Sequence, residues 1–336
     1  GEASRAANWS IYGYNRNTNP ELTKIKGLTA FSHVLTESNT THKSVPMLMS
    51  SVTAHDFNSI YRQKGIITAF KEAGYRTAFF SNQRYNHSFI DFFGKEADIC
   101  DFIKEDTGNG GYNPSDDELL KLVAAELAEN ASKQFIVLHT YGSHFNYRER
   151  YPADNAFFLP DFPVDAELKY KDNLINAYDN SIRYTDNFLA RLIRMLQEQD
   201  IDAAMLYTSD HGEDIFDDDR HLFLHASPVP SYYQIHVPFL IWMSDNYRKN
   251  YPDLFKNAEI NRQKNISSSA SFFQTMLELG GIDTPSRNDS LSVINASYTE
   301  KNRVYLNDHN EARSLNDIGM REEDFTMLQM KGIVYR

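Results

Sequence analysis

Short apolar runs alternate along the chain with longer segments in which apolar residues recur at helical spacing. Each short run is long enough for a buried strand and too short for a helix. These runs predict strands at residues 30–35, 77–80, 135–138, 203–207, 237–242 and 304–307. The helical spacing predicts helices at residues 60–73, 116–131, 168–199 and 269–279, with a loop at residues 108–114. This alternation is typical of an α/β fold in which helices cover both faces of a central, mostly parallel sheet.

Length and composition narrow the class of protein further. The chain has 336 residues, enough for one large α/β domain, and we expect residues 1–336 to form a single domain. No apolar run approaches the roughly 20 residues that a membrane helix needs. The net charge is −12 and basic tracts are lacking, which argues against nucleic acid as a partner. Cys100 is the one cysteine, so no intrachain disulfide can form.

Candidate metal ligands follow the predicted strand at residues 203–207. Asp210 and His211 come directly after it, at the edge of an α/β sheet where ligands bind. They can converge on one ion only if the backbone turns there, which Gly212 permits. A carboxylate beside an imidazole suits zinc or manganese. The alternative is a polar loop that only joins a strand to a helix.

A candidate nucleophile lies near the start of another predicted helix. Residues 37–44 are rich in hydroxyl and amide side chains and lead into an apolar segment with Pro46 near its start, which is how helices begin. Thr41 is therefore either a helix N-cap or a catalytic hydroxyl. The second reading is chemically sound because a helix N-terminus can hold a phosphate while a hydroxyl attacks it.

Three histidines are candidates at the same edge. His139 and His144 follow the predicted strand at residues 135–138, and their position near Asp210 favours a functional role for at least one of them. His225 lies in an apolar stretch and by itself would be a structural core histidine.

Taken together, these segments resemble the phosphoethanolamine transferases, which are alkaline phosphatase-like enzymes that modify lipid A. The opening of the chain carries the most specific part of the resemblance, namely Gly1-Glu2, Arg5, Tyr12-Gly13-Tyr14, Arg16, Thr18 and Pro20. Further matching segments are Thr41 with Ser44-Val45-Pro46, Leu138-His139 with Gly142-Ser143-His144, Arg150-Tyr151-Pro152, and Ser209-Asp210-His211-Gly212-Glu213 with Leu224-His225. The resemblance covers nearly the whole chain and implies a three-layer α/β/α sandwich.

The resemblance implies a metal site and a nucleophile. Glu2, Asp210, His211 and the Thr41 hydroxyl would bind one zinc ion, with manganese the less favoured metal. Thr41 would be the nucleophile, because a metal bound to its hydroxyl favours the alkoxide.

The resemblance also implies residues around that site. His144 and His225 would bind the substrate phosphate or a second zinc, and one of them would protonate the departing alkoxide. Glu213 and His139 would not bind the metal themselves but would contact the residues that do. A basic residue after the strand at residues 77–80 would contact phosphate, and the candidates are Arg84, His87 and Lys95. His221 is a rival to His225, because the loop between His211 and His225 is longer than is usual in the family.

The implied reaction moves phosphoethanolamine from phosphatidylethanolamine to lipid A or core oligosaccharide through a covalent intermediate on Thr41. The implied place is the inner membrane, with an N-terminal membrane domain and a catalytic domain that faces the periplasm. Neither that membrane domain nor the family's disulfides and first strand is present in this sequence. Because that strand would support Glu2, we expect weak metal binding or a displaced Glu2.

Three alternative functions remain open from the sequence. A phosphoglycerol transferase would use the same threonine and zinc, but its opening segment lacks the pattern of residues 12–20. A sulfatase would need a Cys/Ser-x-Pro-x-Arg arrangement, which residues 41–44 do not supply. A non-catalytic domain that binds an envelope glycan or lipid is the alternative from a different class, because fold alone does not prove function.

Overall fold

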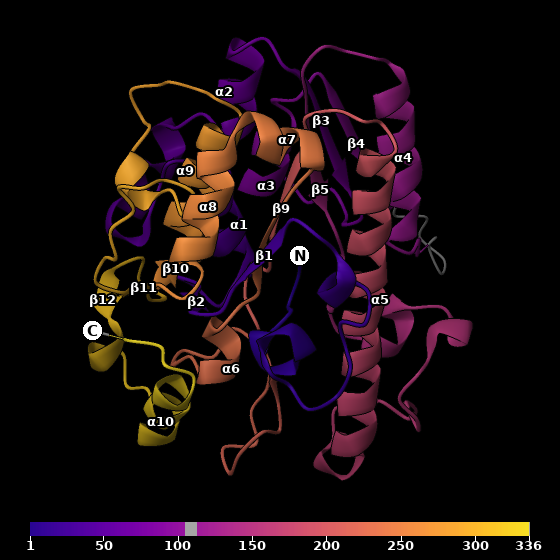
Figure 1. Ribbon diagram of the computed structural model, residues 1–336. Helices are drawn as coiled ribbons and strands as arrows, with labels where there is room; N and C mark the ends of the chain where they lie inside the picture. The colour runs from indigo at the N-terminus through magenta and orange to yellow at the C-terminus, as the bar shows by residue number, and fades with distance from the viewer. Residues whose placement is uncertain (105–112, 336) are drawn as a thin grey trace.

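Two three-stranded sheets lie at the centre of the molecule, and helices cover both sides of them, as far as the described residues show (Figure 1). The structure is a computed structural model and describes residues 1–104 and 113–335. One sheet has the strand order β4-β3-β5 and is parallel throughout. The other has the order β1-β9-β6, and β9 is antiparallel to both of its neighbours.

The strands are β1 (Leu28–Phe31), β2 (Val34–Leu35), β3 (Arg76–Ser81), β4 (Ile99–Phe102), β5 (Gln134–His139), β6 (Ala204–Thr208), β7 (Asp214–Ile215), β8 (Phe223–Leu224), β9 (Phe239–Met243), β10 (Ile266–Ser267), β11 (Val304–Leu306) and β12 (Ala312–Ser314). The α-helices are α1 (Thr41–Met49), α2 (Ile66–Glu72), α3 (Phe89–Gly94), α4 (Asp117–Ala128), α5 (Lys171–Gln197), α6 (Tyr232–Ile235), α7 (Asp245–Asn250), α8 (Pro252–Asn261), α9 (Ser268–Leu279) and α10 (Glu322–Met330).

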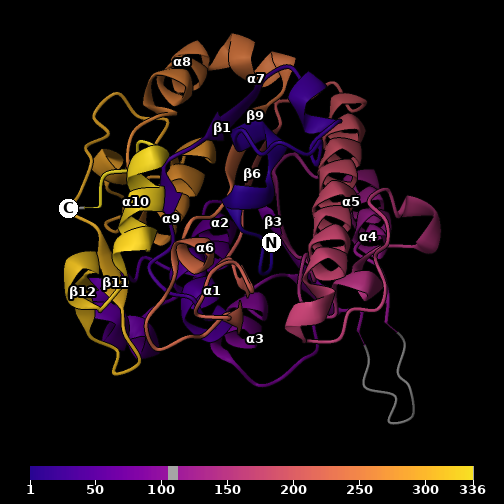
Figure 2. The same ribbon diagram turned by 90° about the horizontal axis from the view of Figure 1, so that it is seen from below.

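Alternate residues of the central strands pack against opposite helical layers, as the two-residue period of a strand requires. In β3, Phe79 packs in a cluster with residues of α1, α2 and α3. Its neighbour Phe80 belongs to a different cluster, built with α4 and α5. Figure 2 shows α4 and α5 on one side of the strands and α1, α2 and α9 on the other. This arrangement confirms the predicted three-layer α/β class.

Most predicted elements are present, and two differ for clear physical reasons. The strand predicted at residues 30–35 is divided into β1 and β2, which pair with different partners, β9 and β10. The helix predicted at residues 60–73 begins only at Ile66, because Gly65 interrupts the pattern and donates its N–H to Glu96 (2.7 Å). The loop predicted at residues 108–114 lies outside the described residues up to residue 112. None of the described helices combines the length and the hydropathy needed to cross a bilayer.

The carboxyl ends of β3, β5 and β6 lie at one edge, where the first residues of the chain join them. The backbone nitrogen of Gly1 donates to the carbonyl of Thr208 at the end of β6 (2.8 Å). The carbonyl of Glu2 accepts from the N–H of Ser143, in the turn after β5 (3.0 Å). Residues 1–4 therefore connect the ends of β5 and β6.

A buried carboxyl group joins this edge to the helices behind it. Glu37, between β2 and α1, is 3% exposed, and its carboxylate accepts a hydrogen bond from the hydroxyl of Ser269 on α9. Burial raises the pKa of Glu37 to about 7, against the opposing effect of that hydrogen bond.

We predict that Glu37→Gln stabilises the protein at alkaline pH. Because the folded-state pKa is raised, the native carboxyl contributes stability that is fully present below pH 4.5 and is lost as the pH rises through about 7. Glutamine still accepts from Ser269 but does not ionise. The melting temperature of the variant should exceed that of the native chain by a few degrees at pH 8 and match it near pH 4.5. An equal difference at both pH values would contradict this account.

Candidate metal centre

Four polar side chains from distant segments meet at the sheet edge. Glu2, Asp210 and His211 offer ligand atoms that lie within 4.8 Å of one another, and all three residues are buried. His211 Nε2 lies 3.4 Å from Glu2 Oε1 and 3.4 Å from Asp210 Oδ2. The hydroxyl of Thr41 lies 3.1 Å from Glu2 Oε1 and 3.0 Å from His211 Nε2. The structure thus brings together the four residues for which the sequence predicts metal binding.

Backbone hydrogen bonds hold Glu2 in this position. Ala3 N–H donates to Asp210 Oδ1 (3.1 Å), and Ser4 N–H donates to the hydroxyl of Ser209 (2.8 Å). With its carbonyl also bound by Ser143, Glu2 is only 1% exposed. The expectation that Glu2 is displaced is therefore wrong. Hydrogen bonds from residues 3 and 4 to the segment after β6 hold Glu2 in place without a preceding strand. The expected weak metal binding stays a prediction.

Thr41 is the first residue of α1, and the N-cap is its neighbour Thr40. The Thr41 hydroxyl contacts Glu2 and His211 instead of the helix's own N–H groups. Thr41 is also partly exposed, whereas Glu2, Asp210 and His211 are buried. Its hydroxyl therefore lies between the buried carboxylates and the solvent.

Two glycines permit the close packing of these segments. Gly142 has a φ of +53°, and a Cβ at this position would lie 2.8 Å from the carbonyl oxygen of Glu2. A Cβ on Gly212 would lie 2.1 Å from the carbonyl oxygen of Tyr233. The sequence predicted a glycine at residue 212 to permit a turn of the backbone, but the structure gives another reason for it. The reason is close approach to a neighbouring chain segment, and not a left-handed backbone.

The imidazole of His211 is oriented by its second nitrogen. Nδ1 lies 2.9 Å from the carbonyl oxygen of Gly212, and since a carbonyl can only accept, Nδ1 carries a proton. In the neutral ring, Nε2 then has a free lone pair, which points toward Glu2, Asp210 and Thr41.

The charges of the candidate ligands perturb one another strongly. Burial raises the pKa of Asp210, and the nearby carboxylate of Glu2 raises it further. Burial also opposes the ionised form of Glu2, but the hydrogen bond and charge of His211 outweigh it and lower the pKa of Glu2. Burial disfavours the imidazolium, yet Asp210 and Glu2 prevail and raise the pKa of His211 to about 9. Without a metal ion, a proton on His211 offsets only part of the negative charge of these two carboxylates.

These residues fit a divalent metal ion. Asp210 Oδ2 is buried and accepts no hydrogen bond from any described residue. In a tetrahedral site with ligands at about 2.0–2.1 Å, neighbouring ligand atoms are about 3.3–3.4 Å apart. The separations from His211 Nε2 to Glu2 and Asp210 are both 3.4 Å, and those from Thr41 are 3.0–3.1 Å. Carboxylate, imidazole and hydroxyl donors in this geometry form a candidate metal centre.

His144 and His225 are partly exposed and lie on the open side of this centre. The His225 ring lies 4.1 Å from that of His211 and 6.5 Å from that of His144, measured between centroids. Glu213 is fully buried, and its Oε2 lies 3.5 Å from His225 Nδ1. His144 Nδ1 donates to the carbonyl of Phe145 (2.5 Å), which leaves its Nε2 available.

The loop that carries His225 is attached to the segment before Thr41. Leu224 and Ala226 on either side of it have positive φ values of 68° and 62°. Ala226 N–H donates to the carbonyl of Asn39 (3.3 Å), and the Asn39 amide donates to the carbonyl of Ser227 (2.9 Å). His221, the predicted rival to His225, is exposed and has none of these contacts.

His139 and Gln83 lie behind Glu2. His139 is buried, its Nδ1 lies 3.1 Å from the Ser81 hydroxyl, and burial lowers its pKa to about 4. The Gln83 amide donates to Glu2 Oε2 (3.0 Å). Sequence reasoning missed Gln83, although its place directly after the strand at residues 77–80 was the available signal.

Two of the predicted basic residues contact a tyrosine outside the four-residue cluster. His87 and Lys95 both contact Tyr85, His87 through its ring (4.6 Å) and Lys95 over the ring face (4.2 Å to its centroid). Arg84 is exposed. A role for any of the three at the substrate phosphate stays a prediction.

With this geometry established, comparison with known proteins decides the family. A family model described as Sulfatase matches residues 1–282. The chain belongs to the sulfatase family. Among its relatives is the Kdo(2)-lipid A phosphoethanolamine 7''-transferase of Escherichia coli, 31% identical over 79% of this chain and 47% of the relative. Phosphoethanolamine transferase EptC of Escherichia coli is 26% identical over 90% of this chain and 53% of the relative.

Solved structures agree with the sulfatase-family assignment. The zinc complex of the C-terminal periplasmic domain of Escherichia coli EptC has a TM-score of 0.85, covers 95% of this chain and 91% of that one, and at 23% identity shows the fold. The integral membrane protein EptA of Neisseria meningitidis has a TM-score of 0.77 at 26% identity, over 87% of this chain and 56% of that one. The predicted resemblance and the alkaline phosphatase-like fold are confirmed. The chain spans about half the length of the curated relatives that it matches.

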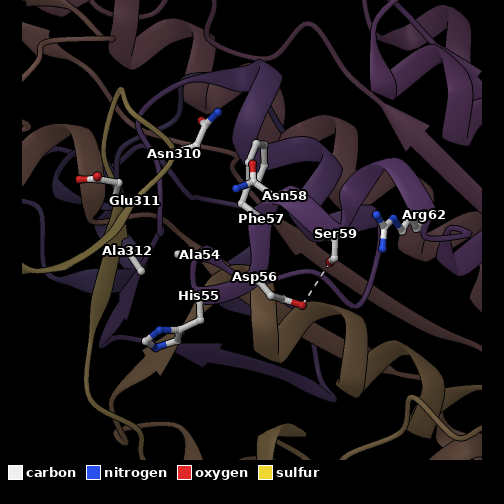
Figure 3. A pocket seen from close by; sticks show the side chains of 10 residues that line it. All are labelled: Ala54, His55, Asp56, Phe57, Asn58, Ser59, Arg62, Asn310, Glu311 and Ala312. Atoms are coloured by element: carbon white, nitrogen blue, oxygen red, sulfur yellow. Dashed lines mark hydrogen bonds between the residues drawn. The ribbon is translucent and has the colours of Figure 1, made fainter.

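A separate surface pocket of about 520 Å³ lies between the 3-10 helix η4 (Ala54–Arg62) and the β11–β12 hairpin (Figure 3). Asp56 and Ser59 form a hydrogen bond there (3.2 Å). No predicted site residue lines it, so it is separate from the candidate metal centre.

We predict that Gly142→Ala lowers the metal content of the chain, and that loss of stability alone does not account for the decrease. The new Cβ would press on the backbone of Glu2, 2.8 Å from its carbonyl oxygen and 2.9 Å from its nitrogen. Gly74→Ala is a matched control, because Gly74 has a φ of +81° with nothing within 4 Å of the added Cβ. Both variants should lose about 1–2 kcal/mol to backbone strain, and Gly142→Ala should lose more because of the contact with Glu2. Metal content should fall only in Gly142→Ala, and equal metal content in the two variants would refute the packing argument.

Proposed function

We propose that this chain is the catalytic domain of a zinc-dependent phosphoethanolamine transferase. The donor is phosphatidylethanolamine, the acceptor is lipid A or core oligosaccharide, and the group passes through a covalent intermediate on Thr41. The whole protein would be anchored in the inner membrane by a preceding domain, with residues 1–336 facing the periplasm as one domain.

One observation carries this proposal. The partly exposed Thr41 hydroxyl lies at the N-terminus of α1 and within 3.0–3.1 Å of two candidate metal ligands, Glu2 and His211. A hydroxyl in that place has both an activating environment and access to substrate. A helix N-terminus also favours the anionic phosphoryl group that Thr41 would attack.

Zinc is the metal that we propose for this site, held by Glu2, Asp210, His211 and the Thr41 hydroxyl. When bound, it would lower the pKa of that hydroxyl and offset negative charge on the phosphoryl oxygens. Two carboxylates and one imidazole suit zinc, and a structural neighbour of 23% identity is a zinc complex.

The protein residues would act in two steps. Thr41 Oγ attacks the phosphorus of the donor, and the bond from phosphorus to the diacylglycerol oxygen breaks. His144 or His225 gives a proton to that oxygen, since both rings lie on the open side of the centre. An acceptor oxygen then attacks the phosphorus and gives its proton to the histidine that lost one, and the bond from phosphorus to Thr41 Oγ breaks. Glu213 would orient His225, which lies 3.5 Å away.

The relatives' names support the substrate class. Both curated relatives are named phosphoethanolamine transferases, and one name specifies Kdo(2)-lipid A as its acceptor. The proposal also includes a phosphate contact from one of Arg84, His87 or Lys95, and either substrate phosphate or a second zinc at His144 and His225.

Thr41→Ala should reduce transfer by at least about 10³-fold, because it removes the nucleophile. Thr41→Ser should keep measurable transfer, since it keeps the hydroxyl. Mass spectrometry of the native chain quenched during turnover should show phosphoethanolamine on the peptide that contains Thr41. Undiminished transfer by Thr41→Ala would reject the proposed intermediate.

Asp210→Asn should lower zinc occupancy of the purified chain well below one ion per chain, because it removes a buried anionic ligand. Asp245→Asn is the control, because the Asp245 side chain is 89% exposed and only pairs with Arg248. Elemental analysis after dialysis measures both variants. Full zinc occupancy in Asp210→Asn would show that the metal binds elsewhere.

A further inference from the structure

Two cationic side chains, Lys104 and Arg150, contact the ring of Tyr141, which stacks on His144 beside the candidate metal centre. Lys104 Nζ lies 3.6 Å from the centroid of the Tyr141 ring, and Arg150 Cζ lies 4.0 Å from the same centroid. Tyr141 in turn stacks on His144, with ring centroids 4.9 Å apart and an interplanar angle of 20°. Since His144 borders the metal centre, the two cations are close to the reacting group without touching it.

The fold brings these cations to the functional edge of the parallel sheet. Lys104 follows β4, and Tyr141 follows β5, so both lie at the carboxyl ends of strands that flank β3. Asp116 fixes the backbone of this turn by accepting from the N–H groups of Tyr141 (2.7 Å) and Gly142 (2.9 Å). The cluster and Glu2 therefore share one rigid turn, because Gly142 packs on Glu2.

Among the described residues, the carboxylates near Lys104 and Arg150 are exposed or already accept several hydrogen bonds. Asp116 already accepts three hydrogen bonds, the third from the Asn82 amide (2.8 Å). Glu149 pairs with Arg150 at 3.1 Å, but its own side chain is 56% exposed. Lys104 forms no ion pair with any residue that the structure describes. Burial lowers the pKa of Lys104 to about 8, and the charges of Arg150 and Arg84 add to that effect.

Such a cluster is well suited to an anion. Arg150 is 7% exposed, and its guanidinium donates to the carbonyl of Asn146 (3.2 Å) and to Glu149, which leaves further N–H donors. Lys104 and Tyr141 are both partly exposed. An anion between an arginine and a lysine would relieve the repulsion between them.

We propose that Lys104 and Arg150 bind a phosphate group of the acceptor, separate from the phosphoryl group that Thr41 transfers. This inference rests on the proposed function. Phosphatidylethanolamine carries a single phosphate, and the proposed reaction places it at Thr41. A second phosphate subsite in the same region therefore serves the other substrate, so the acceptor would itself carry a phosphate group.

Direct binding of inorganic phosphate tests the subsite without turnover. The measurement uses the metal-loaded chain with Thr41 intact and no donor present, and phosphate is titrated by calorimetry. Adding Lys104→Gln should raise the dissociation constant of phosphate about tenfold, the effect of losing one charged contact. Lys104→Arg should restore binding, because it keeps the charge.

Lys133→Gln is the matched control for these titrations. Lys133 also lies over a tyrosine ring, 5.3 Å from the centroid of Tyr75, but it precedes β5 and so lies at the opposite edge of the same sheet. Lys133→Gln should leave the dissociation constant of phosphate unchanged. Equal affinities in Lys104→Gln and Lys133→Gln would overturn the subsite.

Steady-state kinetics distinguishes the acceptor from the donor as the source of the phosphate. With Thr41 intact, Lys104→Gln should raise the KM for a phosphorylated glycolipid acceptor about tenfold and leave kcat and the KM for phosphatidylethanolamine unchanged. A raised KM for the donor instead would overturn the assignment to the acceptor. Failure of the proposed function would appear separately, as undiminished transfer by Thr41→Ala, while the phosphate titration still decides the subsite.

Discussion

Two carboxylates buried side by side are the constraint on which the rest of the site depends. Glu2 and Asp210 are each 1% exposed, and Asp210 Oδ2 accepts no hydrogen bond from the described residues. Buried charges of the same sign are costly unless a cation lies between them. The fold maintains this arrangement through backbone contacts, in which residues 1–4 bind the end of β6 and Gly142 packs against Glu2.

The same constraint connects the fold to the proposed chemistry. A cation placed between these carboxylates would lie next to the Thr41 hydroxyl, which is 3.1 Å from Glu2. The buried carboxylates would therefore fix the place of the proposed nucleophile, and the partly exposed His144 and His225 lie nearby. Farther out, Lys104 and Arg150 extend the positive potential along the sheet edge beyond His144. In the proposed site, positive charge is therefore highest at the metal ion and continues outward through the side chains of Lys104 and Arg150.

Much of this arrangement could be predicted from the sequence. The strand at residues 203–207 and the Asp210-His211 pair after it followed from a short apolar run that ends in polar residues, and β6 lies there. Glu2 could not be found from local pattern alone, because a glutamate near the start of a chain is ordinary, and it came from the family resemblance. For Thr41 the local pattern left two readings open, a helix N-cap or a catalytic hydroxyl, and the resemblance favoured the second.

Other features depend on long-range contacts that leave no local signal. The division of residues 30–35 between β1 and β2 follows from pairing with β9 and β10, which lie more than 200 residues along the chain. The antiparallel direction of β9 is likewise set by its neighbours. Gln83 and Lys104 gain their positions only when β3, β4 and β5 pair side by side. Support for Glu2 was misjudged because the hydrogen bonds from residues 1–4 to residues 208–210 are not visible in the sequence.

The central claim is that residues 2, 41, 210 and 211 share one metal ion, and anomalous diffraction at the zinc edge from crystals of the zinc-loaded chain tests it most directly. The account predicts a single strong peak at about 2.0–2.2 Å from Glu2, Asp210, His211 Nε2 and Thr41 Oγ. A peak at another place, or a Thr41 side chain turned away from the ion, would contradict it.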